Sequence, residues 1–350
     1  MGGERQIDIK KLQDTMKILI TGVHGFVGTN LVKALSKEHT IYGLDIISPI
    51  KEGVRFTFSW DFLDMPDEIP EVDAIIHLAG KAHDTKNQSA ADVYFKVNTD
   101  LTKKIFDYYL KSKAKKFIFF SSVKAAADRV EGEYVDENVI PSPKGPYGES
   151  KIAAENYILE KFKDYSLKFK DSSKADSGKV ETEDSELSAK QVYILRPCMI
   201  HGPGNKGNLN LLYGIVKKGI PWPLGAFENK RTFTSIDNLS FIIEGLLTKN
   251  VESGIYNIND DEAVSTNELI EIICSAMGKK AHIWRIPRGL MEGVAQIGGA
   301  LHLPLNPERL QKLTENYVSS NAKIKKALGV EQLPVRAKDG LKMTIKSFEK

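Results

Sequence analysis

Short apolar runs alternate with longer amphipathic stretches through the first half of the chain. This alternation is typical of βαβ units, in which parallel strands form a sheet and helices cover its faces. The apolar runs predict strands at Lys17–Thr21, Thr40–Asp45, Ala74–Leu78, Phe117–Ser121 and Val192–Arg196. The amphipathic stretches predict helices at Phe26–Ser36, Val93–Lys111 and Tyr147–Phe162. The pattern favours an α/β fold with a Rossmann-like, doubly wound parallel sheet.

The pattern changes after Arg196, where the apolar runs shorten and Pro and Gly become more frequent. We therefore expect residues 16–196 to form mainly the sheet domain. Residues 197–350 are expected to form mainly a smaller, mixed α/β lobe that interleaves with it. Residues 1–15 are polar and predict a disordered leader before the first strand. Residues 166–190 are polar, rich in Ser and charge, and predict an insertion loop at the surface.

Composition excludes several classes of protein. The chain has 49 Lys+Arg against 46 Asp+Glu, a formal charge of +3, and no dense basic block, so we expect no nucleic-acid partner. No stretch reaches the roughly 18 apolar residues of a membrane span. Two cysteines form neither a disulfide framework nor a zinc spacing, and His77 and His83 lack companion ligands. We expect a cytoplasmic protein without a metal site.

The stretch TGVHGFVG follows the first predicted strand and begins the first predicted helix. Its glycines, Gly22, Gly25 and Gly28, permit positive φ and close backbone approach, and the helix offers unpaired N–H groups to an anion. Phe26 and Val27 belong to this first turn. A pyrophosphate fits here. Glycines also serve close packing alone, so the motif needs a second feature beside it.

That second feature is Asp45, which ends the next predicted strand about 20 residues on. A carboxylate there can accept hydrogen bonds from both ribose hydroxyls, and it repels a 2′-phosphate. The pair of features predicts NAD as cofactor and disfavours NADP. The alternative is that Asp45 only caps a loop. Asp61, with Phe62 beside it, is a further candidate, placed to accept from the adenine amino group.

Tyr147 and Lys151 stand four apart and so share one face of a predicted helix. Tyrosine alone has a pKa of about 10, but a neighbouring ammonium and an oxidised nicotinamide would favour the phenolate. Tyr147 could then exchange a proton with a substrate oxygen while hydride moves at the same carbon. Ser122 would orient that oxygen, and Lys151 would also reach the nicotinamide ribose. The alternative is an exposed pair with no catalytic role.

Seven stretches together resemble the extended short-chain dehydrogenase/reductases, in particular the NAD-dependent epimerase/dehydratase family acting on nucleotide sugars. They are TGVHGFVG, HLAGKAH, VNTDLT, FFSSVK, YGESK, LRPCMIHGPG and RTFTSIDNL. The resemblance implies catalytic roles for Ser122, Tyr147 and Lys151. It also implies cofactor contacts that involve Leu78, Ala79, Gly80, Asn98 and Ser121, with Asn98 tying the central sheet together.

The same resemblance implies a UDP-sugar substrate. Asn208 and Arg231 would meet its diphosphate, Arg309 would supply a second contact, and Pro223–Gly225 would lie near the base. Lys124 would hold or polarise the substrate, unless it is a solvated loop lysine. An Arg suits this task because its planar fork makes bidentate bonds to phosphate. By resemblance we also expect a homodimer, with Val93–Lys111 and Tyr147–Phe162 pairing across a two-fold axis.

Three reactions share this constellation. Dehydration is disfavoured, because the family's dehydratases carry Asp-Glu after the catalytic Ser/Thr where this chain has Val123 and Lys124. The form LRPCMIHGPG is common in sugar reductases, so we favour a 4-keto-sugar reductase in cell-surface polysaccharide biosynthesis. A UDP-glucose or UDP-N-acetylglucosamine 4-epimerase remains the alternative. A non-catalytic, NAD-sensing binding module is a third reading, which the intact Ser-Tyr-Lys set opposes.

Overall fold

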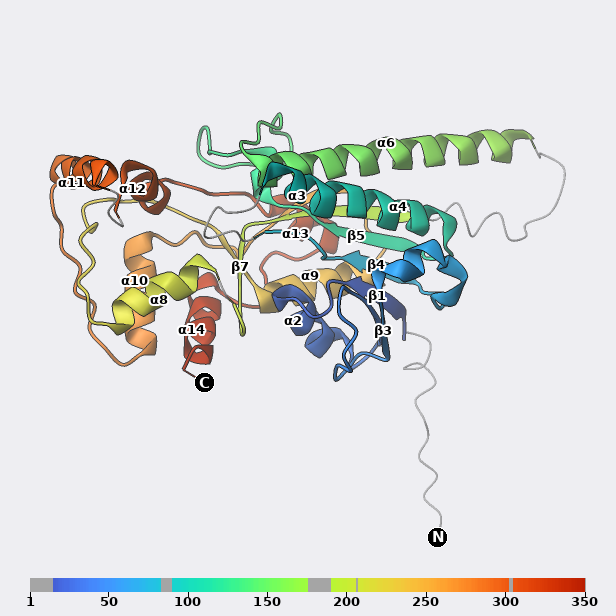
Figure 1. Cartoon of the computed structure of the whole chain (residues 1–350), viewed down its shortest axis with the longest axis horizontal. Helices are drawn as coiled ribbons and strands as arrows, with labels where there is room; N and C mark the ends of the chain where they lie inside the picture. The colour runs from blue at the N-terminus through green and yellow to red at the C-terminus, as the bar shows by residue number, and fades with distance from the viewer. Residues whose placement is uncertain (1–14, 83–89, 176–189, 206, 302–304, 350) are drawn as a thin grey trace, which may run out of the picture. The chain divides into compact units, whose positions relative to one another are not determined.

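The computed structural model describes residues 15–82, 90–175, 190–205, 207–301 and 305–349 (Figure 1). The expected leader 1–15 thus lies almost entirely outside the described residues, as does the centre of the expected insertion loop. The described chain forms two compact units. The first contains the described residues of 1–125, 143–195 and 242–256, and the second those of 126–142, 196–241 and 257–350.

A seven-stranded sheet organises the first unit, with strand order β3-β2-β1-β4-β5-β6-β9. The strands are β1 (Lys17–Thr21), β2 (Thr40–Leu44), β3 (Phe56–Phe58), β4 (Ala74–His77), β5 (Lys116–Phe120), β6 (Gln191–Pro197) and β9 (Gly254–Ile258). β1 lies between β2 and β4, and Ile18 pairs with Ile41 on one side and Ala74 on the other. Strands β3, β2, β1, β4, β5 and β6 pair in parallel, so the predicted doubly wound fold is confirmed.

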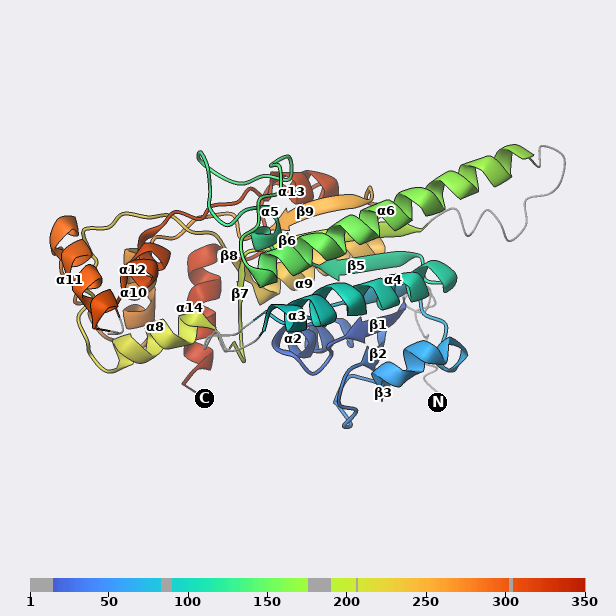
Figure 2. The same ribbon diagram turned by 45° about the horizontal axis from the view of Figure 1, so that its top comes forward.

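Helices cover both faces of this sheet (Figures 1 and 2). On one face lie α3 (Ala91–Phe95), the π-helical turn η3 (Lys96–Asp100), α4 (Leu101–Lys111) and α6 (Pro146–Ala175). On the other lie α2 (Phe26–Leu35) and α9 (Ile236–Thr248), which begins in the second unit. Leu19, Ile75 and Phe117 of the strands pack with Phe106 and Ile158 of the helices in one buried core. Apolar runs became strands because a sheet covered on both faces buries nearly every side chain.

The remaining elements of the first unit are short. They are η1 (Trp60–Asp64) and η2 (Pro66–Glu68), both 3₁₀, and α5 (Val123–Ala126), whose last residue belongs to the second unit.

The second unit is mixed α/β. It contains a two-stranded parallel sheet of β7 (Met199–His201) and β8 (Phe233–Ser235). Its helices are α8 (Asn208–Lys217), α10 (Thr266–Ala276), α11 (Arg288–Ala300), α12 (Pro307–Thr314), α13 (Ala322–Leu328) and α14 (Ala337–Ser347). Leu212, Trp222, Phe233 and Leu341 belong to its core.

The expected insertion loop begins as helix instead. α6 continues past Phe162 to Ala175 and is 30 residues long, because no Gly or Pro follows Pro146 and Gly148 until Gly178. Lys190, the expected end of the loop, is buried rather than at the surface. Its ammonium donates to the carbonyls of Tyr109, Ser112 and Ala114 at 3.0, 2.8 and 2.6 Å. The prediction of a surface loop from polar composition was therefore wrong at both ends of the segment, where residues 166–175 are helical and Lys190 is buried.

No helix in the described part of the chain is long and apolar enough to cross a membrane.

Candidate active site

The glycine turn needs its glycines for two reasons. Gly22 has φ +71°, and a Cβ there would lie 3.0 Å from the Ala79 nitrogen. A Cβ on Gly28 would lie 2.8 Å from Val23 Cα, so α2 can cross the turn closely only without a side chain. The turn is thus held against both the start of α2 and the loop after β4.

The amino end of α2 is open to an anion. Gly25 is the N-cap, and no side chain accepts from the first turn, which contains Phe26, Val27 and Gly28. These N–H groups have no partner within the helix, and they lie at its positive dipole end. The geometry therefore fits the predicted pyrophosphate.

Asp45 directly follows β2 beside this turn. Its carboxylate is buried and accepts from the backbone N–H groups of His24 at 2.9 Å and Ile46 at 2.8 Å. The His24 bond ties Asp45 to the turn itself. This is the position that a ribose-binding carboxylate needs, although two N–H bonds also give Asp45 the loop role of the alternative interpretation.

The loop after β4 joins the glycine turn to the catalytic helix. Ala79 N–H donates to Thr21 Oγ1 at 3.1 Å. A Cβ on Gly80 would lie 3.0 Å from both Asn98 Oδ1 and Lys151 Nζ. Leu78 and Ala79 are half-buried and Gly80 is exposed. The loop therefore places a glycine, which has no side chain, beside Lys151.

Asn98 fastens that loop from a π-helical turn. Its side-chain Oδ1 accepts from Lys81 N–H at 2.7 Å, and its Nδ2 donates to Lys81 O at 3.1 Å and Ser150 Oγ at 3.0 Å. π-turns within helices occur frequently at functional sites. Asn98 thus ties the loop after β4 to α6. We expected Asn98 to tie the central sheet together and to contact the cofactor; its side-chain hydrogen bonds go to Lys81 and Ser150.

The structure brings Ser122 to Tyr147. Ser122 is the second residue after β5 and is buried, and its side chain lowers the pKa of the Tyr147 phenol as a hydrogen-bond partner. Ser122 Oγ also accepts from Lys124 N–H at 3.2 Å, and Tyr94 packs edge-on against the Tyr147 ring at 6.4 Å between centroids. Two hydroxyls on one hydrogen bond can converge on a single substrate oxygen.

The pKa of Tyr147 departs from expectation in the chain without cofactor. Burial raises it, the bond from Ser122 lowers it by less, and Tyr94 adds to the rise. We expected Lys151 to lower this pKa. Instead, the Lys151 ammonium donates to Phe120 O at 2.7 Å, and burial of the phenol dominates. The phenol is therefore protonated at neutral pH, ready to donate.

Lys151 is buried on α6, and its ammonium lies over the Phe119 ring, 5.0 Å from the centroid. Burial lowers its pKa to about 8, opposed by the negative charge of Glu155. In turn, burial and then the Lys151 charge lower the pKa of His77 to about 3. His77 is therefore neutral at neutral pH, and Lys151 remains cationic.

Glu155 is the residue that the sequence analysis missed. It lies one turn beyond Lys151 on α6, is fully buried, and accepts from the Ser121 hydroxyl. Tyr147, Lys151 and Glu155 repeat every four residues, and this spacing was the available signal. Ser121, expected at the cofactor, directs its hydroxyl to Glu155 instead.

Of the other predicted residues of the first unit, Lys124 contacts Ser122 through its backbone, and Asp61 and Phe62 have their partners elsewhere. Asp61 is exposed in η1 and accepts from Ser59 Oγ at 3.2 Å. Phe62 packs edge-on against Phe58, 5.0 Å between centroids. Lys124 is half-buried in α5, just after Ser122.

The second unit contains three candidates for contacts to the substrate diphosphate. Two of them, Arg231 and Arg309, lie at α12. Arg231 donates to the Lys312 carbonyl at 2.9 Å, and its guanidinium lies 4.0 Å from the Glu315 carboxylate. Arg309 is exposed on α12 itself. Asn208 is exposed at the first position of α8. Arg231 is therefore held partly by protein groups, with burial lowering its pKa.

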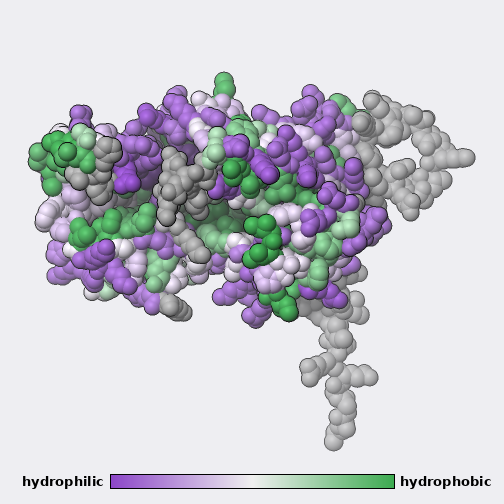
Figure 3. Space-filling view, viewed as in Figure 1, coloured by the Kyte–Doolittle hydropathy of each residue, from purple (hydrophilic) through white to green (hydrophobic). Residues whose placement is uncertain are grey.

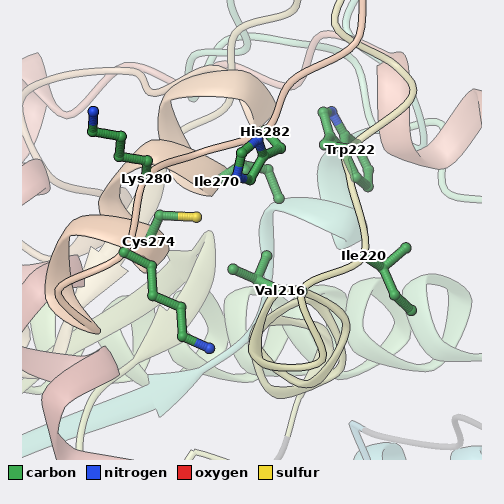
Figure 4. A pocket seen from close by; sticks show the side chains of 9 residues that line it. Val216, Ile220, Trp222, Ile270, Cys274, Lys280 and His282 are labelled. Atoms are coloured by element: carbon green, nitrogen blue, oxygen red, sulfur yellow. The ribbon is translucent and has the colours of Figure 1, made fainter.

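A cavity of about 340 Å³ also lies in the second unit (Figure 4). Val216 from α8 and Cys274 from α10 line it, together with Ile220, Trp222 and His282. It adjoins the Pro223–Gly225 segment, where Leu224 is buried in the core, but contains no predicted site residue.

Fold and site together define a dinucleotide-binding α/β protein with a Ser-Tyr-Lys set beside the cofactor loops. The open α2 terminus, the glycine cradle and the Asp45 carboxylate fit NAD. The chain belongs to the NAD dependent epimerase/dehydratase family, whose profile matches residues 18–258. The resemblance and the cofactor predicted from the sequence are thus confirmed.

Curated relatives carry several activities. UDP-glucose 4-epimerase of Vibrio cholerae is 31% identical over 292 residues, covering 77% of this chain and 78% of the relative. N-acetyl-alpha-D-glucosaminyl-diphospho-ditrans,octacis-undecaprenol 4-epimerase of Escherichia coli O157:H7 is 27% identical, covering 90% and 86%. GDP-6-deoxy-D-mannose reductase of Pseudomonas aeruginosa is 24% identical, covering 74% and 79%. Epimerases and a reductase therefore both occur among the similar proteins.

Solved structures share the fold. UDP-glucuronic acid 4-epimerase from Bacillus cereus, in complex with NAD, superposes with a TM-score of 0.69 at 20% identity, covering 95% of this chain and 99% of that one.

Proposed function

We propose that this enzyme transfers hydride between NAD(H) and C4 of a UDP-linked hexose or N-acetylhexose, and we slightly prefer a 4-keto-sugar reductase over a 4-epimerase. The hydrogen bond between Ser122 and Tyr147, with Lys151 buried beside Gly80, carries the proposal. In this proposal the sugar oxygen and the nicotinamide meet beside these groups.

NADH supplies the hydride when bound. The chain's own task is the proton and the geometry. Tyr147 donates its phenolic proton to the C4 oxygen as that oxygen gains negative charge. Ser122 donates to the same oxygen and orients it. Lys151, a cation at neutral pH, is the group that we propose reaches the cofactor ribose.

Reduction is favoured over the other family reactions by two features. Val123 and Lys124 follow Ser122, so the acid pair that dehydration needs is missing at that place in the sequence. The protonated phenol also suits donation to a carbonyl. The second candidate is a UDP-sugar 4-epimerase, which uses both directions at the same site. The name and 31% identity of the Vibrio cholerae relative support it.

For the substrate we propose contacts from Arg231, Asn208 and Arg309 to the diphosphate, and from Lys124 near the sugar. Arg231 is suited to bidentate phosphate binding, and Arg309 adds charge on the same helix that holds it. The relative from Escherichia coli acts, by its name, on a sugar joined through a diphosphate to undecaprenol. A diphosphate is the group that these arginines would bind in either case.

We also propose a cytoplasmic homodimer in which Val93–Lys111, from α3 to α4, and Tyr147–Phe162 of α6 pair across a two-fold axis. Val93 of α3 and Leu159 of α6 are exposed large apolar residues. Sedimentation at the monomer mass would overturn the dimer.

The test separates the two reactions by their need for reductant. With excess NADH and UDP-4-keto-6-deoxy-N-acetylglucosamine, a reductase consumes NADH over many turnovers. With UDP-glucose or UDP-N-acetylglucosamine and no added cofactor, an epimerase forms the C4 epimer. Consumption in the first assay alone supports the reductase. Epimer formation in the second, with NADH flat in the first, would replace it by the epimerase.

A further inference from the structure

Helix α11 has two apolar faces, and only one of them is covered. Met291, Ala295 and Gly298 form the buried face. Four large apolar residues stand beside it in solvent, with exposed fractions between 46% and 63%: Leu290, Val294, Ile297 and Leu301, here called the α11 stripe. Hydrophobic atoms gather over α11 at the upper left of Figure 3, in the place that the helix has in Figure 1.

The stripe is continuous along the helix. Its members are four, three and four residues apart, so they fall in one row on the helix surface. The charged residues of α11, Arg288 and Glu292, fall outside that row. Single exposed apolar residues are common on proteins, whereas a row of four marks an interaction surface.

The segment before the stripe is basic. Residues 272–289 contain Lys279, Lys280, Arg285 and Arg288, with Glu271 before the segment and Glu292 on α11. Lys279 donates to Lys217 O and Arg288 to Ala226 O. Lys280 and Arg285 are exposed, and so is Trp284, at 56%. An apolar helix face, with cations and an exposed Trp in the segment that precedes it, is typical of a protein that lies on a membrane interface.

We propose that the α11 stripe docks on the surface of an anionic lipid bilayer. The four apolar side chains enter the boundary between headgroups and acyl chains, while Lys280 and Arg285 of the preceding segment are attracted to the anionic headgroups. The protein lies on the bilayer through this helix. The proposal goes beyond the catalytic function and does not depend on which C4 reaction the enzyme performs.

A second copy of the chain fits this surface less well. A stable interface between two copies buries about 800 Å² on each partner, more than one row of four side chains supplies. A two-fold interface over this region would also bring the basic segments of both copies together. Anionic lipid complements that charge instead.

Vesicle flotation tests the proposal on the full-length protein. Vesicles contain either phosphatidylglycerol with phosphatidylcholine or phosphatidylcholine alone. Wild type should float with the anionic vesicles, and less at high salt. The variant L290Q/V294Q/I297Q should bind them about tenfold more weakly, because each Gln removes an apolar side chain from the stripe. K280E/R285E should weaken binding to the anionic vesicles and leave binding to the pure phosphatidylcholine vesicles unchanged.

The control variant I140Q/M343Q changes two exposed apolar residues of the same unit away from α11 and should float as wild type does. An unchanged thermal unfolding midpoint shows that the stripe variant folds. Failure of wild type to float, or equal flotation of the stripe variant, would overturn the proposal. If the stripe variant instead changed only the sedimenting mass, the stripe would be an interface between copies.

Discussion

The buried carboxylate of Glu155 accepts a hydrogen bond from Ser121 and lies one helical turn beyond Lys151. It thus connects the residue before Ser122 to the helix that carries Tyr147 and Lys151. Its negative charge also opposes the lowering of the Lys151 pKa by burial. We interpret Glu155 as a positioning residue that acts through Lys151.

Glu155→Gln should move the pH dependence of catalysis. Lys151 has a pKa of about 8, so its positive charge is lost as pH rises through that value. Without the Glu155 charge this pKa falls further, and kcat/KM should begin to decline at lower pH than in wild type. Glu160→Gln, an exposed change on the same helix, is the control. Coincident pH profiles for Glu155→Gln and wild type would refute the assignment.

Asp45→Asn should relax the choice of cofactor. The amide keeps the shape of the side chain but removes the charge that repels a 2′-phosphate, so KM for NADPH should fall relative to KM for NADH. Because Asp45 also accepts from His24 and Ile46, the thermal midpoint of the variant is measured beside the kinetics. An unchanged preference for NADH over NADPH in a stable variant would show that Asp45 serves only to hold the loop.

Gly28→Ala should abolish tight NADH binding. The added Cβ would lie 2.8 Å from Val23 Cα, which forces the turn and α2 apart. Gly214→Ala is the matched control, because it adds a Cβ in a helix where nothing lies within 4 Å. That change should leave binding unaltered and raise stability by up to about 1 kcal/mol. Fluorescence titration with NADH measures the affinity of both variants. Equal affinities would contradict the proposal that the turn from Gly22 to Gly28 binds the cofactor.

The buried strands were predictable because each reads as an apolar run. β1, β2, β4, β5 and β6 lie within one residue of their predicted ends. β3, from Phe56 to Phe58, was missed because three residues carry too little pattern. The predicted end of α6 was too early because the polar composition of its last turns resembles that of a loop. Element boundaries of this kind depend on what packs against the chain.

The site was predictable where its chemistry is local. The spacing of Tyr147 and Lys151 and of the three glycines appears in the sequence itself. The pairing of Ser121 with Glu155 does not, because it joins positions 34 apart and appears only when α6 packs beside the end of β5. The pKa of Tyr147 was also beyond reach, since burial of the phenol sets its direction.

His77 should make the fold sensitive to acid. It is fully buried between Thr21 and Thr102, with hydrogen bonds of 2.7 and 2.9 Å, and its pKa is about 3. In the unfolded chain its pKa is about 6.5, so only the unfolded state gains this proton as pH falls from about 6.5 toward 3. The free energy of unfolding therefore decreases over that window.

His77→Gln should show a shallower loss of thermal stability between about pH 7 and pH 5 than wild type. His282→Gln, at an exposed histidine, should follow the wild-type slope. The slopes from melts at several pH values decide the matter. An identical slope in His77→Gln would exclude His77 as a source of acid sensitivity.

The most direct test of the catalytic account follows the hydride itself. NADH carrying deuterium at the transferred position is incubated with UDP-4-keto-6-deoxy-N-acetylglucosamine, and the product is examined by NMR. We predict deuterium at C4 of the hexose, and formation of this product slower by a factor of about 10²–10⁴ in Tyr147→Phe, which retains NADH binding. A product without deuterium at C4, or an unimpaired Tyr147→Phe enzyme, would contradict the account.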